Sequence, residues 1–155
     1  MPKFNAVQTV DVVAIHQLLS EWAKEIDENQ GVGIGPMLTD DCAYSLPVKA
    51  YKGRSEVVAY YRARVAELSA TPEGVPTQRH VLANLCVDFT GADAAKVSFV
   101  MTYYTGLSTS SGNSPADPAL VGDGDMIVQR ESDGEWRIAG LDTEVVAFRA
   151  SAVVR

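Results

Sequence analysis

The spacing of apolar residues changes near residue 77, and this change restricts the fold more than any other feature of the sequence. Before it, apolar residues recur every three or four positions; after it, they alternate with polar residues over long segments. The first pattern forms one face of an α-helix, and the second is typical of a strand with one buried face. Helices followed by consecutive strands predict an α+β fold, with the N-terminal helices packed on one face of an antiparallel sheet.

Two helices and one short strand are expected in the first part of the chain. Thr9 is a candidate N-cap for the first helix, and glycines at 31, 33 and 35 end its pattern. A helical turn then leads into a short strand at about 42–46, and a second helix begins after Gly53 and ends near Pro72. The apolar stripe of the first helix consists of Val12, Ile15, Leu19, Trp22 and Ile26. That of the second consists of Val57, Tyr61, Val65 and Leu68.

Four long strands are expected in the second part, at about 79–90, 95–107, 120–131 and 135–149. The turn at Ser132–Gly134 has the Asp-Gly chemistry of a hairpin. The loop from Ser108 to Ala119 is rich in Ser, Gly and Pro, so we expect a surface excursion or a lid over a pocket. With no repeat and no linker, the 155 residues predict a single domain over 1–155.

The charge of the chain argues against two classes of partner. Thirteen basic and 20 acidic residues give a formal net charge of −7, with no Lys/Arg cluster. We therefore expect no nucleic acid and no membrane partner. The first fifteen residues lack the apolar core of a signal peptide, and no segment has the roughly 20 apolar residues that span a bilayer. These features predict a cytoplasmic protein.

The two cysteines, Cys42 and Cys86, predict neither a metal site nor a redox motif. No CxxC is present, and neither cysteine stands at zinc-site spacing from a histidine. Each lies in an apolar segment expected to form a strand, so we expect two buried free thiols. No sequence motif indicates a metal or an organic cofactor.

His80, one of only two histidines, lies at the start of the first long strand. Simple alternation places His80, Leu82, Asn84 and Cys86 on one face. It places Val81, Ala83, Leu85, Val87 and Phe89 on the other. The second, wholly apolar face resembles a core, which would leave the histidine outside. A bulge that shifts the phase by one residue would change this, and the mixed first face also suits a pocket wall.

Asp27 ends the first helix, next to the stripe residue Ile26. One interpretation is a solvated carboxylate among Glu25 and Glu28. The other is a carboxylate that points inward and accepts a hydrogen bond from one N–H of an imidazole, which leaves the second nitrogen free as a base. The residue pattern alone leaves both open.

Five short segments in a fixed order resemble the SnoaL-like domains of the nuclear transport factor 2-like superfamily. They are WAKEID at 22–27, LTDDC at 38–42, YKGR at 51–54, RHVLAN at 79–84 and DGEWRI at 133–138. The resemblance runs from about residue 10 to 148. The group includes polyketide cyclases, scytalone dehydratase, limonene-epoxide hydrolase-like proteins and the hexachlorocyclohexane dehydrochlorinase. The resemblance implies a cone-shaped curved sheet with helices on one face, enclosing a pocket.

The resemblance also implies roles for particular residues. Asp27 and His80 match the carboxylate and the catalytic base of the dehydratase and dehydrochlorinase branch. Asn84 repeats the spacing of an asparagine after that histidine, and Arg130 falls near an arginine that helps a leaving anion depart. The sequence lacks the second cavity histidine of the dehydratase, because His16 lies on the first helix instead.

Four further residues are candidates for substrate contacts. Asp125 stands where polyketide cyclases place an acid–base aspartate, although a solvated strand carboxylate is the alternative. Tyr44 and Tyr104 offer hydroxyls to a substrate oxygen, although tyrosines in strands commonly serve packing. Trp22, in the apolar stripe of the first helix, is a candidate for the pocket wall.

Together these features predict a cofactor-independent acid–base enzyme of the lyase, isomerase/cyclase or hydrolase type. Its substrate would be a small, largely apolar molecule. The alternatives are a non-catalytic small-ligand-binding module and, ranked lowest, a structural subunit. Because apolar residues occupy both faces of the long strands, we also expect a homodimer joined sheet to sheet. Such an interface buries at least about 1,200 Å² in total.

Overall fold

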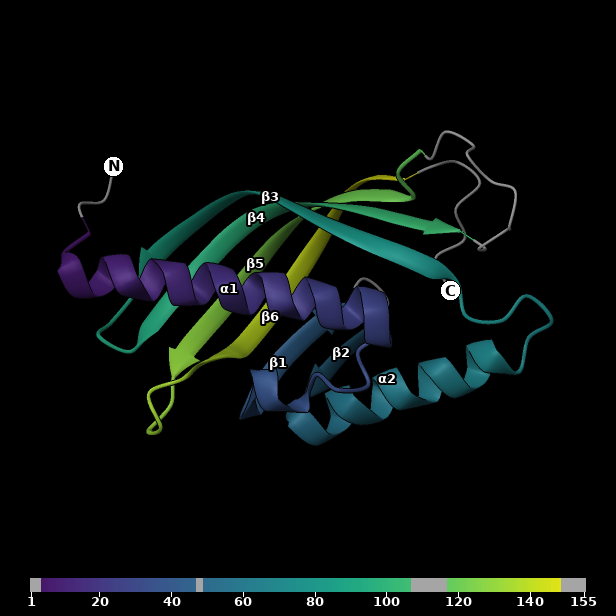
Figure 1. The fold of residues 1–155 in the computed structure, drawn as a ribbon, viewed down its shortest axis with the longest axis horizontal. Helices are drawn as coiled ribbons and strands as arrows, with labels where there is room; N and C mark the ends of the chain where they lie inside the picture. Colours follow the sequence, from purple (N-terminus) through teal and green to yellow (C-terminus); the bar gives the residue numbers. More distant parts are fainter. Residues whose placement is uncertain (1–3, 47–48, 107–116, 149–155) are drawn as a thin grey trace.

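The computed structural model describes residues 4–46, 49–106 and 117–148. They form two α-helices, one short 3₁₀ helix and a six-stranded sheet (Figure 1). The helical elements are α1 (Ala6–Asn29), η1 (Gly35–Met37) and α2 (Arg54–Ser69). The strands are β1 (Leu38–Leu46), β2 (Lys49–Lys52), β3 (Thr77–Phe89), β4 (Ala94–Gly106), β5 (Leu120–Arg130) and β6 (Trp136–Phe148).

The strands form one curved, unclosed sheet in the order β2-β1-β6-β5-β4-β3. Every neighbouring pair is antiparallel except β1 and β6, which run parallel. Helix α1 lies across one face of the sheet, and α2 lies beside β1 and β2 (Figure 1). The expected α+β architecture with helices on one face is confirmed, with one parallel pair in an otherwise antiparallel sheet.

Helix α1 begins three residues before the expected cap at Thr9. Asn5 is the N-cap, and its side chain and that of Gln8 each accept from the other's backbone N–H, a reciprocal capping box. The helix ends at Asn29, and its C-cap Gln30 adopts the left-handed conformation that closes many helices. Its buried face contains the predicted stripe except Val12, which is half-buried: Asp11, Ile15, Leu18, Leu19, Trp22, Ala23 and Ile26.

Helix α2 buries only part of its predicted stripe. Val57 and Tyr61 are buried, whereas Val65 and Leu68 are half-buried because this end of the helix extends past the sheet. The turn expected before the first strand is the 3₁₀ helix η1. Strand β2 was not expected, because a four-residue edge strand with one buried side chain, Tyr51, shows no alternation. Neither described helix has an apolar stretch long enough to cross a membrane.

The four long strands agree with the sequence pattern. Each of β3, β4, β5 and β6 begins and ends within about two residues of its expected bounds. The hairpin turn at Ser132–Gly134 is present, with Gly134 at φ 87°. Most of the loop expected at Ser108–Ala119 lies outside the described residues, so its expected role as a lid stays a prediction.

A β-bulge in β3 decides which side of this strand faces the helices. Ala83 pairs with Val100 and Cys86 pairs with Ser98, so Asn84 and Leu85 together oppose one residue of β4. Asn84 has φ 54°, the left-handed conformation that lets the chain insert the extra residue.

The bulge moves the buried face of β3 from even to odd positions. Before it, Gln78 and His80 are more buried than their neighbours Arg79 and Val81. After it, Val87 is buried and Leu85 and Phe89 are half-buried, whereas Cys86 and Asp88 are exposed. The phase-shifting bulge considered in the sequence analysis is therefore present in the structure.

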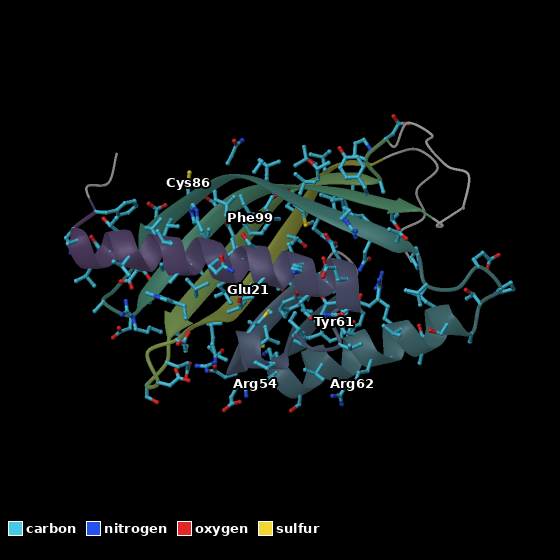
Figure 2. All side chains as sticks on the ribbon, viewed as in Figure 1. Glu21, Arg54, Tyr61, Arg62, Cys86 and Phe99 are labelled. Carbon is cyan, nitrogen blue, oxygen red and sulfur yellow. The ribbon has the colours of Figure 1, made fainter. Side chains whose placement is uncertain are left out.

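The two cysteines have different surroundings. Cys42 is a buried free thiol, as expected, whereas Cys86 is a free thiol on the exposed outer face. Cys86 projects from the side of β3 away from α1, and Phe99 lies between α1 and the sheet (Figure 2). The expectation of a buried Cys86 is wrong, because simple alternation does not include the bulge.

Candidate functional site

A pocket of about 140 Å³ lies between the helices and the sheet. Its walls come from the C-terminal half of α1, from α2 and from five of the strands. Its lining is largely apolar and aromatic: Trp22, Ile26, Leu46, Tyr60, Tyr61, Met101, Tyr103, Leu120 and Leu141. Four polar residues complete it: Arg64, Gln78, His80 and Thr143. An apolar cavity with a few polar groups is the usual form of a small-molecule site.

His80 lines this pocket, and Asp27 of α1 contacts it. The carboxylate oxygen Oδ1 of Asp27 lies 2.7 Å from Nδ1 of His80. The same carboxylate accepts the backbone N–H of His80, at 3.1 and 2.9 Å to its two oxygens. Both side chains are largely buried, with 13% of His80 and 9% of Asp27 exposed. The contact expected between these residues, 53 positions apart, is therefore present.

The hydrogen bond between them determines how the imidazole ring is used. A carboxylate offers only acceptors, so Nδ1 carries the hydrogen and donates a hydrogen bond to Asp27. The other nitrogen, Nε2, then holds a free lone pair. Within the described part of the chain, no hydrogen bond involves Nε2, and the residue lines the pocket.

Two aromatic rings pack against the imidazole of His80. The Tyr103 ring lies 4.7 Å from the His80 ring at an interplanar angle of 36°. The Trp22 ring meets His80 edge to face at 6.0 Å. A ring fixed at Nδ1 and packed against two aromatic rings is restricted in orientation, which suits a residue that must present Nε2 in a constant direction.

Trp22 is itself held by a chain of buried hydroxyls. Its indole Nε1–H donates to the Tyr44 hydroxyl at 2.9 Å, and that hydroxyl lies 2.9 Å from the Tyr61 hydroxyl. Burial raises the pKa of Tyr44 and Tyr61, so both hydroxyls stay protonated. Gly31, at φ 76°, lets the Tyr61 ring approach so closely that a Cβ there would lie 2.5 Å from it. Trp22 and Tyr61 line the pocket, whereas Tyr44 lies behind them.

A second polar group in the pocket was not expected from the sequence. Gln78 is 2% exposed, and its amide donates to the Ile26 carbonyl at 2.5 Å and to Gln30 Oε1 at 3.1 Å. Arg64 donates to Gln30 Oε1 at 3.1 Å and to Gln78 Oε1 at 3.2 Å. The sequence contains only weak indications that these two residues reach the pocket. Gln78 shares a strand face with His80, and Arg64 follows Tyr61 by three positions on α2.

Three of the predicted substrate-contact residues lie on the outer face of the sheet, away from this pocket. Asn84 and Asp125 border a separate hollow of about 290 Å³ there, and Lys96 forms an ion pair with Asp125 at 2.8 Å. Tyr104 follows the inward-facing Tyr103 and so points outward. These placements differ from expectation because the bulge and the strand phase turn the side chains away from His80.

Arg130 lies at the other end of the sheet and serves the packing of α1. Its guanidinium forms an ion pair with the buried Asp11, and its Cζ atom lies 4.9 Å from the Trp136 ring centroid. The Trp136 indole also donates to Asp11, at 3.3 Å. The structure therefore places Arg130 apart from Asp27 and His80, contrary to the expected role beside a leaving anion.

Acidic side chains gather in the outer hollow. It is lined by Asn84, Ser98, Phe99, Val100, Asp123, Gly124, Asp125, Asp142 and Glu144. Among the residues that the structure describes, no three His, Cys, Asp or Glu side chains are grouped as a metal site requires.

The curved sheet, the helices over one face and the pocket between them define an α+β cone with an internal pocket. The chain belongs to the SnoaL-like domain family, whose model matches residues 8–142. No curated protein sequence is detectably similar to it.

Solved structures share this fold at low sequence identity. A protein from Catenulispora acidiphila superposes with a TM-score of 0.73 and 15% identity, over 91% of this chain and 95% of its own. A proposed scytalone dehydratase from Novosphingobium aromaticivorans gives 0.73 and 19%, over 94% and 91%. ActVI-ORFA from Streptomyces coelicolor gives 0.72 and 11%, over 87% and 97%. These similarities establish the nuclear transport factor 2-like fold.

Proposed function

We propose that this chain is a cofactor-independent acid–base enzyme that acts on a small, largely apolar molecule, with Asp27 and His80 as its catalytic dyad. The observation that carries the proposal is the 2.7 Å contact between Asp27 Oδ1 and His80 Nδ1 at the wall of an apolar pocket. That contact orients the imidazole and leaves Nε2 available to a ligand.

In this mechanism, Nε2 of His80 removes a proton from the substrate, and the electron pair of the broken bond stays on the substrate. The imidazolium that forms is stabilised by the Asp27 carboxylate. The proton is then returned to a leaving group, to another atom of the substrate or to an alkoxide, in an elimination, an isomerisation or a cyclisation. Removal of a proton from water in place of substrate would give hydrolysis. Proton transfer of this kind contributes about 10²–10⁴ to a rate.

The size of the pocket limits the substrate. An engineered apolar cavity of about 150 Å³ in another protein holds one benzene molecule. A pocket of about 140 Å³ therefore suits a core of about one six-membered ring. One solved structure of the same fold is named as a proposed scytalone dehydratase, and elimination is among the reactions that the dyad fits.

Hydrogen exchange into small cyclic ketones tests the proposal and does not require the natural substrate. In D₂O, we expect the protein to accelerate deuterium uptake next to the carbonyl of at least one ketone in a panel of five- and six-membered rings, followed by NMR. His80→Gln should lower the accelerated rate by about 10²–10⁴. His16→Gln is the matched control, because His16 is the other histidine and is exposed on α1.

Binding of panel members without any accelerated exchange would contradict the enzyme and favour the non-catalytic ligand-binding module. Asp27→Asn provides a second check. The amide oxygen can still accept the backbone N–H of His80, but the carboxylate charge that stabilises the imidazolium is lost. We expect it to fold and to exchange more slowly.

We also propose that the protein is a homodimer joined through the outer face of the sheet. Exposed apolar side chains lie on the strands there, with Val81, Ile127 and Val146 at 50%, 40% and 64% exposure. A second copy is the partner that most often covers such a face.

A further inference from the structure

Arg64 carries a positive charge into the pocket without an acidic partner. Its side chain is half-buried and lines the pocket on the side of α2. Within the described residues, no carboxylate lies within ion-pair distance of it, and its two hydrogen bonds go to the neutral amide oxygens of Gln30 and Gln78. A guanidinium has five N–H donors, so three stay available.

The other half-buried arginines in the described residues are neutralised. Arg54 pairs with Asp40 at 3.0 Å, Arg137 pairs with Asp133 at 2.6 Å, and Arg130 pairs with Asp11. Burial of a charge is costly without a counter-charge, so an unneutralised guanidinium in an apolar pocket favours an anion there.

The residues around Arg64 hold it without cancelling its charge. Gln78 donates to the Ile26 carbonyl and to Gln30, which turns both amide oxygens toward the guanidinium. Glutamate at either position would form an ion pair, whereas glutamine supplies only a neutral acceptor. Burial is the chief cause of the raised pKa of Tyr60, and the positive charge of Arg64 acts against that rise. The charge of Arg64 therefore acts on a residue of the pocket wall.

We propose that Arg64 is the anion-binding residue of the pocket and that the ligand is a small carboxylate-bearing ring compound. Its carboxylate would accept hydrogen bonds from Arg64, and its ring would lie against the pocket's apolar and aromatic walls. Another part of the same molecule would then face Nε2 of His80. That such a ligand is also the substrate rests on the proposed function; that it binds does not.

Benzoate and benzamide provide the test, because they share size and shape and differ in charge at pH 7. By NMR titration or calorimetry, we expect benzoate to bind at least about tenfold more tightly, the effect of a hydrogen bond to a charged group. Arg64→Gln should remove this preference, and Arg64→Lys, which keeps the charge but not the fork geometry, should retain part of it.

Arg62→Gln is the matched control. Arg62 precedes Arg64 on α2 but is exposed and points away from the sheet, whereas Tyr61 points toward α1 (Figure 2). Arg62→Gln removes one positive charge from the same helix and should leave the preference for benzoate unchanged. If Arg64 had a purely structural role, Arg64→Gln would weaken the binding of benzoate and benzamide equally. The ratio of their affinities would then be unchanged.

Three outcomes would overturn the proposal: equal affinities for the two probes in the unaltered protein, a preference unchanged in Arg64→Gln, or binding of neither at about 10 mM. The first and third need no variant, so the test does not depend on the folding of Arg64→Gln. His80→Gln separates this proposal from the proposed function. If that variant keeps the preference for benzoate while the unaltered protein exchanges no ketone protons, the anion site stands and the enzyme does not.

Discussion

Single hydrogen bonds shape the back wall of the pocket. The indole of Trp22, the hydroxyl of Tyr44 and the hydroxyl of Tyr61 form a chain that is buried throughout. Tyr44 is its central member and accepts a hydrogen bond from the indole N–H. The chain fixes the indole that packs against His80, so a residue outside the pocket influences the orientation of one inside it.

Tyr44→Phe should therefore destabilise the protein. The substitution keeps the ring and removes the hydroxyl, which leaves the Trp22 N–H and the Tyr61 hydroxyl without their partner. We expect a loss of about 1–3 kcal/mol in the free energy of unfolding, measured by urea denaturation followed by tryptophan fluorescence.

Tyr104→Phe is the control for this substitution. It removes the same group from the outer face of the sheet, where no hydrogen bond of the described residues uses it. Its effect should stay within about 0.5 kcal/mol. Equal effects of the two variants would show that the buried chain adds nothing to stability.

Among the secondary-structure elements, β3 has two features that position the site. It is an edge strand, and Asp27 of α1 accepts its outward backbone N–H at His80. This contact joins α1 to β3 and fixes the position of His80 relative to Asp27. Four residues later, the bulge returns the apolar side chains of β3 to the core.

Strand β5 accommodates its neighbour through a glycine. The Phe99 side chain from β4 lies over Gly124, and a Cβ on that glycine would lie 2.4 Å from the ring. Gly124→Ala should destabilise by about 1–3 kcal/mol, because the buried ring has to move. Gly106→Ala is the control, since nothing lies within 4 Å of a Cβ there. The measurement is the thermal unfolding of both variants and of a double variant that combines Gly124→Ala with Phe99→Leu.

Partial recovery of stability in the double variant would identify the ring as the obstacle. An unchanged melting temperature for Gly124→Ala alone would contradict the close approach.

The whole molecule presents two opposite faces of one sheet. The inner face holds the core and the pocket, and the outer face mixes apolar side chains with acids. Asp123 of β5 stands opposite Glu144 of β6, and Asp125 stands opposite Asp142 two positions further along the same two strands. Like charges directly across a sheet repel each other, and Lys96 neutralises only part of this set.

A sheet-to-sheet dimer would bring these carboxylates close to a second copy. We therefore expect dimerisation to strengthen with salt, because the repulsion between exposed charges decays over about 10 Å at 0.1 M ionic strength and over shorter distances at higher salt. Light scattering at micromolar concentration, from about 0.02 to 0.5 M NaCl, should show the mass rise toward twice 16.6 kDa.

Asp123→Asn combined with Glu144→Gln should reduce the salt dependence and favour the dimer at low salt. A mass of 16.6 kDa under all conditions would exclude the dimer. The apolar residues on the outer face would then need another explanation.

The sequence alone determined the fold class, the two helices and the bounds of the long strands. Those features follow from local periodicity, which is set by residues a few positions apart. The family resemblance paired Asp27 with His80, and the structure contains that contact. The candidate contact residues that lie on the outer face are Asn84, Tyr104 and Asp125, because one inserted residue or a change of strand phase reverses the direction of a side chain. Arg130 lies instead at the other end of the sheet, where it pairs with Asp11.

Tertiary structure alone decided which residues share the pocket. Gln78 and Arg64 are inconspicuous in the sequence, and they become a polar site because α1, α2 and β3 converge on them. The bulge at Asn84 depends on one backbone conformation that no local pattern signals. Side-chain type records what a residue is able to do, whereas direction and neighbours come from contacts between segments far apart in the chain.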